Sequence, residues 1–444
     1  MSVSSGRSVI PHRRWWIGVL LGSGILVNYF DRITLSVAAP QLQQEFGLSP
    51  AQIGLIFSVF FWSYALLQIP VGVVLDRFGV MPIGRIGAAL WSVATALTAL
   101  ASGVGGIITA RLLLGIAEAP AFPANAKATG YWFPRSERGL ATAIFDSAAK
   151  FSNVIGAPLI GLAIVHFGWR GAFWSMAILN LAYFVVFYLV YRDPSADPRL
   201  SAIEYDYIRS GGGAVEGAAA TGAGAMLGYL LSTRKIWGLT IGFAAYGYSF
   251  ALFLTWLPGY LVRELHMSIL GSAEYTAIPW IVATVADLVI GGWLIDHLIR
   301  GGNDETRVRK TVLVTGMLLG LAVFGAAFTT NPALAIIWIS VALGGLAAAA
   351  PVGWSIPALI APKGGAATVG GIMNFVNNLM GAVAPIVTGF IVGVTGSFNG
   401  AFLIAGIALL IGIFAYVVLL GRIEPISDVP TPQGRSATSD RAAS

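Results

Sequence analysis

The sequence contains no cysteine and very little charge. None of its 444 residues is cysteine and only 10% are charged, whereas a soluble protein of this size usually carries about 25% charged residues. Without cysteine the chain has no disulfides, no thiol chemistry and no cysteine-ligated metal site. The 4 histidines are scattered along the chain. We therefore expect no metal site, no cofactor and no enzyme chemistry.

Long apolar runs dominate what is present. Hydrophobic residues make up 57% of the chain and the mean hydropathy is +0.79. Runs of this length are typical of membrane-spanning helices. The sequence predicts an all-α membrane protein with 12 transmembrane helices, approximately at residues 14–39, 50–75, 83–103, 105–127, 138–165, 171–191, 235–262, 273–296, 310–330, 332–361, 366–394 and 396–421.

The basic residues predict the orientation of these spans. With the N-terminus inside, all but five of the 26 lysines and arginines fall in cytoplasmic segments. Arg170 and Arg263 lie in external loops, and Arg32, Arg111 and Lys150 lie inside spans. This asymmetry follows the positive-inside rule. We expect a multi-pass protein of the cell membrane, the inner membrane of a bacterium, with both termini cytoplasmic. The net charge of +6 then reflects topology, and we expect no nucleic-acid partner.

A polar and then Gly/Ala-rich stretch interrupts the apolar pattern at residues 192–234. It predicts a cytoplasmic linker between an N-terminal six-helix bundle, residues 1–191, and a C-terminal six-helix bundle, residues 235–421, with residues 422–444 as a cytoplasmic tail. Within the linker, Ser201 and Glu204 have the spacing of a capping box and predict a short surface helix near residues 200–208. The Gly/Ala-rich part is typical of a flexible linker.

An internal repeat supports this division. Gly72-Val-Val-Leu-Asp76-Arg77-Phe-Gly79 follows the second span, and Gly292-Trp-Leu-Ile-Asp296-His297 follows the eighth. The spacing from glycine to aspartate is the same in both. Parallel six-helix repeats of this kind build one large transporter fold. The alternative for either copy alone is ordinary loop chemistry.

The segment from Gly72 to Gly79 resembles the loop signature of the major facilitator superfamily. Within it, the chain is similar to the anion:cation symporter family, which includes sugar-acid, hexuronate, galactonate, glucarate and phthalate permeases. The stretches that carry this resemblance are residues 28–36, 111–123, 131–139, 253–262 and 371–379.

Ionisable residues at bilayer depth are costly and indicate function. Arg32 is the candidate for binding a substrate carboxylate, because a guanidinium pairs with carboxylate through two hydrogen bonds. Tyr29 and Tyr64 are further substrate-binding candidates, with core or interfacial packing as the alternative. Asp31 and Glu118 are candidate proton carriers, and Arg111 shares a helical face with Glu118. The resemblance implies proton coupling at the matching acids; the alternative is a static ion pair.

Other polar residues are candidates for shaping the site. Lys150 is expected to add a positive charge to the cavity, or to pair with Asp146 four residues earlier. Asp287 is a lone acid in the second half that could pair with Lys150 or Arg111. Asn374 and Asn378 share a face and offer donors and acceptors for substrate hydroxyls; the alternative is hydrogen bonding between helices. The resemblance implies that Gly72, Asp76 and Arg77 form a conformational latch.

These features predict a secondary active transporter that moves an organic anion, most simply a sugar acid, into the cell together with protons. We expect a monomer in the lipid bilayer. The alternatives are an anion exchanger of the organophosphate-antiporter type, an efflux pump and a transporter-like membrane sensor.

Overall fold

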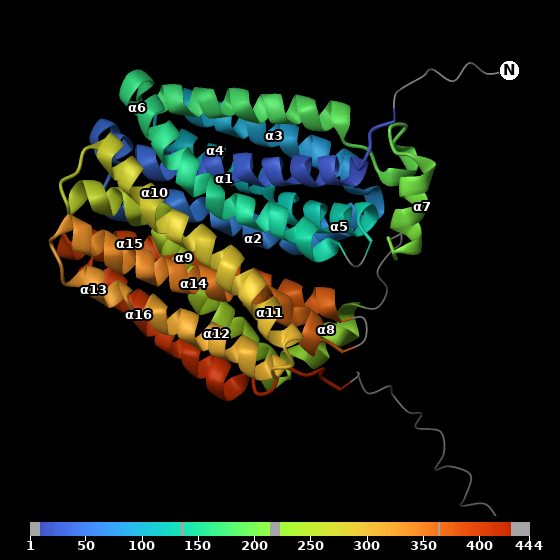
Figure 1. The fold of residues 1–444 in the computed structure, drawn as a ribbon. Coiled ribbons are helices and arrows are strands. Elements are labelled where there is room, and N and C mark those ends of the chain that lie inside the picture. Colours follow the sequence, from blue (N-terminus) through green and yellow to red (C-terminus); the bar gives the residue numbers. More distant parts are fainter. Residues whose placement is uncertain (1–8, 135–136, 214–222, 363–364, 428–444) are drawn as a thin grey trace, which may run out of the picture.

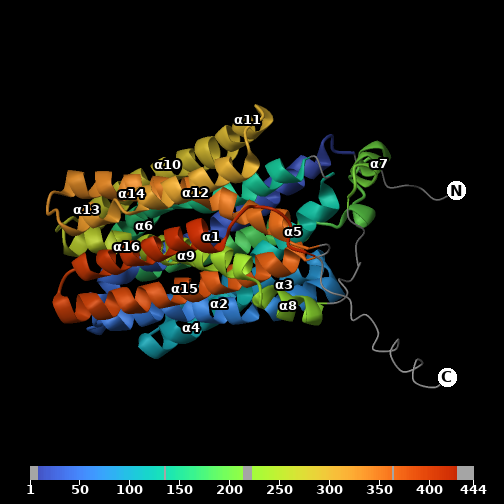
Figure 2. The same cartoon turned by 90° about the horizontal axis from the view of Figure 1, so that it is seen from below.

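The computed structural model describes residues 9–134, 137–213, 223–362 and 365–427, and these residues form helices and connecting turns, with no β-strand among them (Figure 1). The middle of the predicted flexible linker and most of the predicted tail lie outside the described residues. The helices run side by side along one direction, as expected for a protein that spans a bilayer (Figures 1 and 2).

The first half of the chain forms one group of helices. They are α1 (Arg13–Phe46), α2 (Pro50–Phe78), α3 (Val80–Leu100), α4 (Val104–Glu118), α5 (Ala121–Trp132) and α6 (Arg138–Val190). α2 begins with a capping box in which Ser49 accepts from the backbone N–H of Gln52. Pro120 separates α4 from α5, because proline cannot donate the hydrogen bond that a helix interior requires.

The second half forms the other group. It consists of α9 (Arg234–Arg263), α10 (Ile269–Ala286), the π-helix η2 (Asp287–Leu294), α11 (Ile295–Arg300), α12 (Glu305–Gly320), α13 (Val323–Ala327), α14 (Pro332–Ile360), α15 (Ala366–Thr395), α16 (Asn399–Phe414) and the π-helix η3 (Ala415–Leu419). Between the halves lie the 3₁₀ turn η1 (Pro194–Ala196), α7 (Ala202–Ser210) and α8 (Ala223–Leu231).

The helices agree with the twelve predicted spans. Within the described part of the chain, 10 segments are long and apolar enough to cross a membrane. One of them, residues 140–190, contains two predicted spans, because the chain turns at Gly168 where φ is +68°. α1 is outside these ten, because Asn28, Asp31 and Arg32 interrupt its apolar run. The total is twelve when α6 is counted as two spans and α1 is added to the ten segments.

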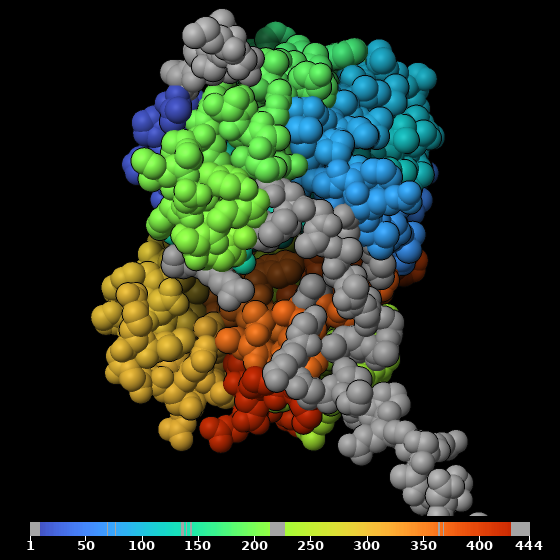
Figure 3. All heavy atoms as spheres, turned by 90° about the vertical axis from the view of Figure 1, so that its right-hand side faces the viewer, coloured from blue at the N-terminus to red at the C-terminus, as the bar shows by residue number. Residues whose placement is uncertain are grey.

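The two halves touch at the end of the molecule that lies away from α7. There the Ser36 hydroxyl of α1 donates a hydrogen bond of 2.6 Å to the backbone oxygen of Thr255 in α9. Gly54 of α2 packs directly against the backbone of α15 at Pro385. At the α7 end the surface is hollowed between the two halves (Figure 3). The molecule is therefore closed at one end and open at the other.

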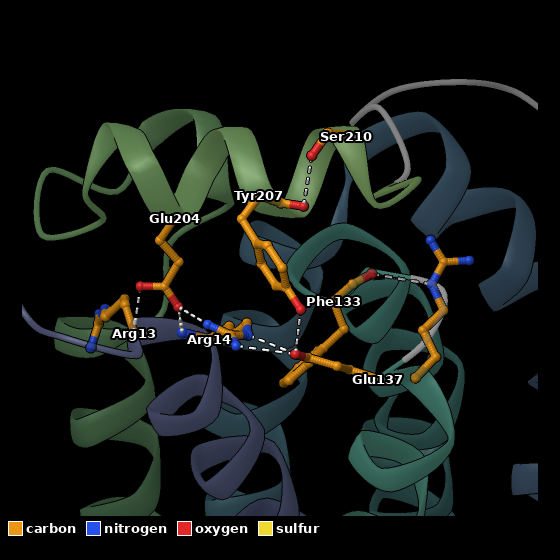
Figure 4. A network of polar contacts seen from close by, with 8 residues as sticks. Arg13, Arg14, Phe133, Glu137, Glu204, Tyr207 and Ser210 are labelled. Carbon is orange, nitrogen blue, oxygen red and sulfur yellow. Dashed lines mark hydrogen bonds and ion pairs between the residues drawn. The ribbon is translucent and has the colours of Figure 1, made fainter.

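A polar clamp fixes α7 to the first half (Figure 4). Ser201 caps α7 by accepting a 3.0 Å hydrogen bond from the Glu204 backbone N–H, which confirms the predicted surface helix. The Glu204 carboxylate lies 2.8 Å from the Arg14 guanidinium. Arg14 also bonds Glu137 at 2.7 Å, and Tyr207 donates to Glu137 at 2.8 Å. The Arg14 guanidinium lowers the pKa of the Glu137 carboxyl group.

Candidate substrate and proton site

Arg32 lies in a buried aromatic box in the first half. Its guanidinium carbon lies 4.6 Å from the ring centres of Tyr29 and Phe60 and 5.2 Å from that of Tyr64. Such cation–π contacts hold a cation without consuming its hydrogen-bond donors. The residue is 9% exposed, and its Nε atom has no hydrogen-bond partner among the described residues. Arg32 thus keeps a free donor for an anionic ligand.

The structure pairs Arg32 with Glu118. The Arg32 terminal nitrogen lies 3.4 Å from a Glu118 carboxylate oxygen, and it donates to the Asn28 side-chain oxygen at 3.0 Å. Asn28 is one helical turn before Arg32, which explains that contact. Glu118 is fully buried, and its Oε1 atom accepts no hydrogen bond from the described residues. This carboxylate therefore has room for a proton or another donor.

Asp31 and Arg32 are adjacent in the sequence but face different neighbours. Successive helical residues are rotated by about 100°, so Asp31 points toward α3 and α6. It accepts from the Thr95 hydroxyl at 2.9 Å and from the Asn180 amide at 2.8 and 3.1 Å. Arg111 approaches only its backbone oxygen, at 3.4 Å. Thr95 and Asn180 were not predicted as site residues, because single hydroxyls and amides are common in membrane helices.

Lys150 and Asp287 join the two halves. The Lys150 ammonium lies 2.9 Å from Asp146 on its own helix, α6, and 3.2 Å from Asp287 of the opposite half. The side chains of Lys150 and Asp287 are 4% and 5% exposed. Both pairings that the sequence suggested for Lys150 are present at once.

The second half contributes amides. Asn378 donates to the backbone and side-chain oxygens of Asn374 at 2.9 Å. Asn374 in turn donates to Gln68 of α2 at 3.5 Å, across the interface between the halves. Gln68 was also missed by sequence reasoning. The Gln68 contact places Asn374 at the interface between the halves, and Asn378, one helical turn later, lies on the same face of α15.

The predicted latch lies at the α7 end of α2. Arg77 is exposed, with its guanidinium 5.2 Å from the Phe78 ring. A side chain on Gly72 would meet no other atom within 4 Å. The side chain of Asp76 is outside the described part of the structure, and the latch stays a prediction.

Comparison with known proteins identifies the family. The sequence profile of the Major Facilitator Superfamily matches residues 21–381, with a further match at residues 303–442. The chain belongs to the major facilitator superfamily. It is accordingly a membrane transport protein and not an enzyme.

Relatives of this superfamily member match nearly its whole length. It is 35% identical to the probable galactarate/D-glucarate transporter GudP of Escherichia coli, over 97% of this chain and 99% of that protein. It is 32% identical to a D-galactonate transporter of Escherichia coli, over 93% and 97%. It is 44% identical to the transporter YybO of Bacillus subtilis, over 94% and 96%. The resemblance to the sugar-acid permease branch is thereby confirmed.

A solved structure shows the same fold. A bacterial homologue of the human lysosomal transporter Spinster, in an inward-facing and occupied conformation, superposes with a TM-score of 0.73, covering 91% of this chain and 96% of that one. The sequence identity is 16%, so this likeness supports the architecture and carries no information on substrate.

Proposed function

We propose that this superfamily member is a secondary active transporter that carries a sugar acid into the cell together with protons. The observation that carries the proposal is the contact between Arg32 and Glu118 inside the aromatic box. The names of the sugar-acid relatives support the substrate class.

The Arg32–Glu118 contact suggests how proton and substrate binding are coupled. While Glu118 is ionised, it competes with a substrate carboxylate for the same guanidinium. A proton on Glu118 removes that competition and leaves Arg32 with an unbalanced positive charge in a buried site, which favours an anion. Proton and substrate thus bind together. Asp31, held by Asn180 and Thr95, is the second proposed proton carrier, and Arg111 lies beside its backbone.

The same proposal includes topology. We place both termini and α7 on the cytoplasmic side of a bacterial inner membrane, so the hollow end faces the cytoplasm and the molecule is inward-facing. Two bundles rock about a central site, the first at residues 1–191 and the second at residues 235–421. Residues 192–234 connect the bundles, and residues 422–444 form a tail. One chain contains both bundles and suffices as a monomer. Tyr29, Tyr64, Asn374 and Asn378 complete the substrate site, and Gly72, Asp76 and Arg77 latch the cytoplasmic side in the opposite state.

The decisive experiment is uptake of labelled galactonate and galactarate into proteoliposomes with and without an inward proton gradient. Gradient-driven accumulation of either acid supports symport. Uptake that requires a preloaded counter-anion and ignores the gradient would instead establish an exchanger, since exchange needs no titrating acid.

A further inference from the structure

The Lys150 cluster, defined as Lys150, Asp146 and Asp287, carries more acid than base. One ammonium group is bonded to two carboxylates, at 2.9 Å and 3.2 Å, so the ionised cluster has a net charge of −1.

The cluster borders water and not lipid. The Asp146 side chain is 23% exposed although it lies inside the span at residues 138–165, and an ionised carboxylate inside a membrane span is expected to face a protein interior or a water-filled path. Tyr29 connects this region to the carboxylate site. Its ring lies 4.6 Å from the Arg32 guanidinium carbon and 6.3 Å from the ring of Phe122, which in turn lies 6.1 Å from the ring of Phe145. Phe145 directly precedes Asp146 in α6, so a series of aromatic rings connects Arg32 with the cluster.

Asp287 also has unused hydrogen-bonding capacity. The residue is 4% exposed, and its Oδ1 atom lies 3.2 Å from the Lys150 ammonium. A carboxylate oxygen has more than one lone pair, so a hydroxyl group of a ligand can donate a further hydrogen bond to Asp287. Asp287 moreover begins the π-helix η2, and π-helical segments inside α-helices frequently occur at functional sites.

We infer that the Lys150 cluster is a specificity site that selects polyhydroxy acids with a single carboxylate and excludes dicarboxylates. The carboxylate binds at Arg32, and the uncharged hydroxyl end lies at the cluster, where Asp287 accepts a hydrogen bond. A second carboxylate at that end meets the net negative charge and is repelled. This inference rests on the proposed function and narrows its substrate class.

The test compares galactonate, with one carboxylate, and galactarate, with two, as competitors of labelled galactonate binding to the full-length protein. We expect galactonate to compete at least about tenfold better, the effect of one unit charge in a site of intermediate dielectric. Asp287→Asn removes the negative charge and keeps an acceptor oxygen. It should therefore reduce the ratio of the galactarate to the galactonate inhibition constant by about tenfold. Glu274→Gln makes the same charge change at an exposed position of α10 and should leave the ratio unchanged.

Asp146→Asn removes the other negative charge beside Lys150 and should also reduce the preference for galactonate over galactarate. This variant keeps the inference testable if Asp287→Asn does not fold. Wild-type preference for galactarate, or an unchanged ratio in the Asp146 and Asp287 variants, would overturn the inference and leave the proposed function intact. Absence of binding of either acid to the wild-type protein would overturn both.

Discussion

A methyl group at Gly54 should open the closed end of the transporter. A Cβ atom built on Gly54 of α2 would overlap the carbonyl oxygen of Pro385 in α15 and would lie 3.1 Å from its carbonyl carbon. On the other side of the same crossing, a Cβ on Gly389 would overlap the carbonyl oxygen of Pro50. Because the obstructing atoms belong to the backbone, no side-chain rotation relieves the overlap. Gly54→Ala must therefore separate the two helices.

The size of the effect follows from overpacking. Extra methyl groups in packed sites typically cost about 1–3 kcal/mol. The cost applies only to the state in which α2 and α15 touch, and the proposed alternation of the two halves would separate these helices in the opposite state. The ratio of the two states should then shift by about 5- to 150-fold toward opening of this end.

The cysteine-free sequence makes the assay direct. Ser36→Cys introduces a single thiol at a buried position, 1% exposed, of the closed end, and its reaction rate with a membrane-impermeant maleimide reports opening. We expect faster labelling when Gly54→Ala is added. Gly393→Ala is the matched control on α15, because its Cβ would lie 3.9 Å from the Ala51 nitrogen, an ordinary contact. Equal labelling rates in the Gly54 and Gly393 variants would refute the reasoning.

Four further outcomes are expected. Arg32→Ala should abolish binding of the labelled sugar acid, and wild-type accumulation by this variant would contradict the role of the guanidinium. Glu118→Gln should retain counterflow exchange and lose proton-driven accumulation, both measured in proteoliposomes. Asn180→Ala should leave the buried Asp31 carboxylate without its amide donor, a cost of about 1–3 kcal/mol, and lower the melting temperature in detergent. Arg14→Ala should also lower thermal stability while transport persists. Arg14 lowers the pKa of Glu137 in the folded protein. The difference in stability between the wild type and Arg14→Ala should therefore have its full size above the unfolded pKa of about 4.3, and it should disappear as the pH falls below the lowered pKa.

Patterns within one helix could be predicted from the sequence, whereas partners between helices could not. The Ser201 cap, the spans and the charged residues inside them depend on local spacing, and the structure contains them where expected. Arg111 and Glu118 show the limit of this reasoning. Seven residues put them on one face, but they are then about 10 Å apart along the axis, too far to bond directly. Glu118 instead contacts Arg32 of α1, a partner that only the tertiary packing of the first half brings within reach.

We expect loading and movement of this transporter to depend on different contacts. Arg32 and Glu118 both belong to the first half, so exchanging a carboxylate partner for a substrate there requires no movement of one half against the other. The Lys150–Asp287 ion pair and the Gln68–Asn374 hydrogen bond cross between the halves. A substrate that reaches from Arg32 to Asp287 contacts both sets. Its carboxylate would fill the local site, whereas its hydroxyl end would also contact the residues that join the halves, so we expect the length and charge of that end to affect both binding and transport.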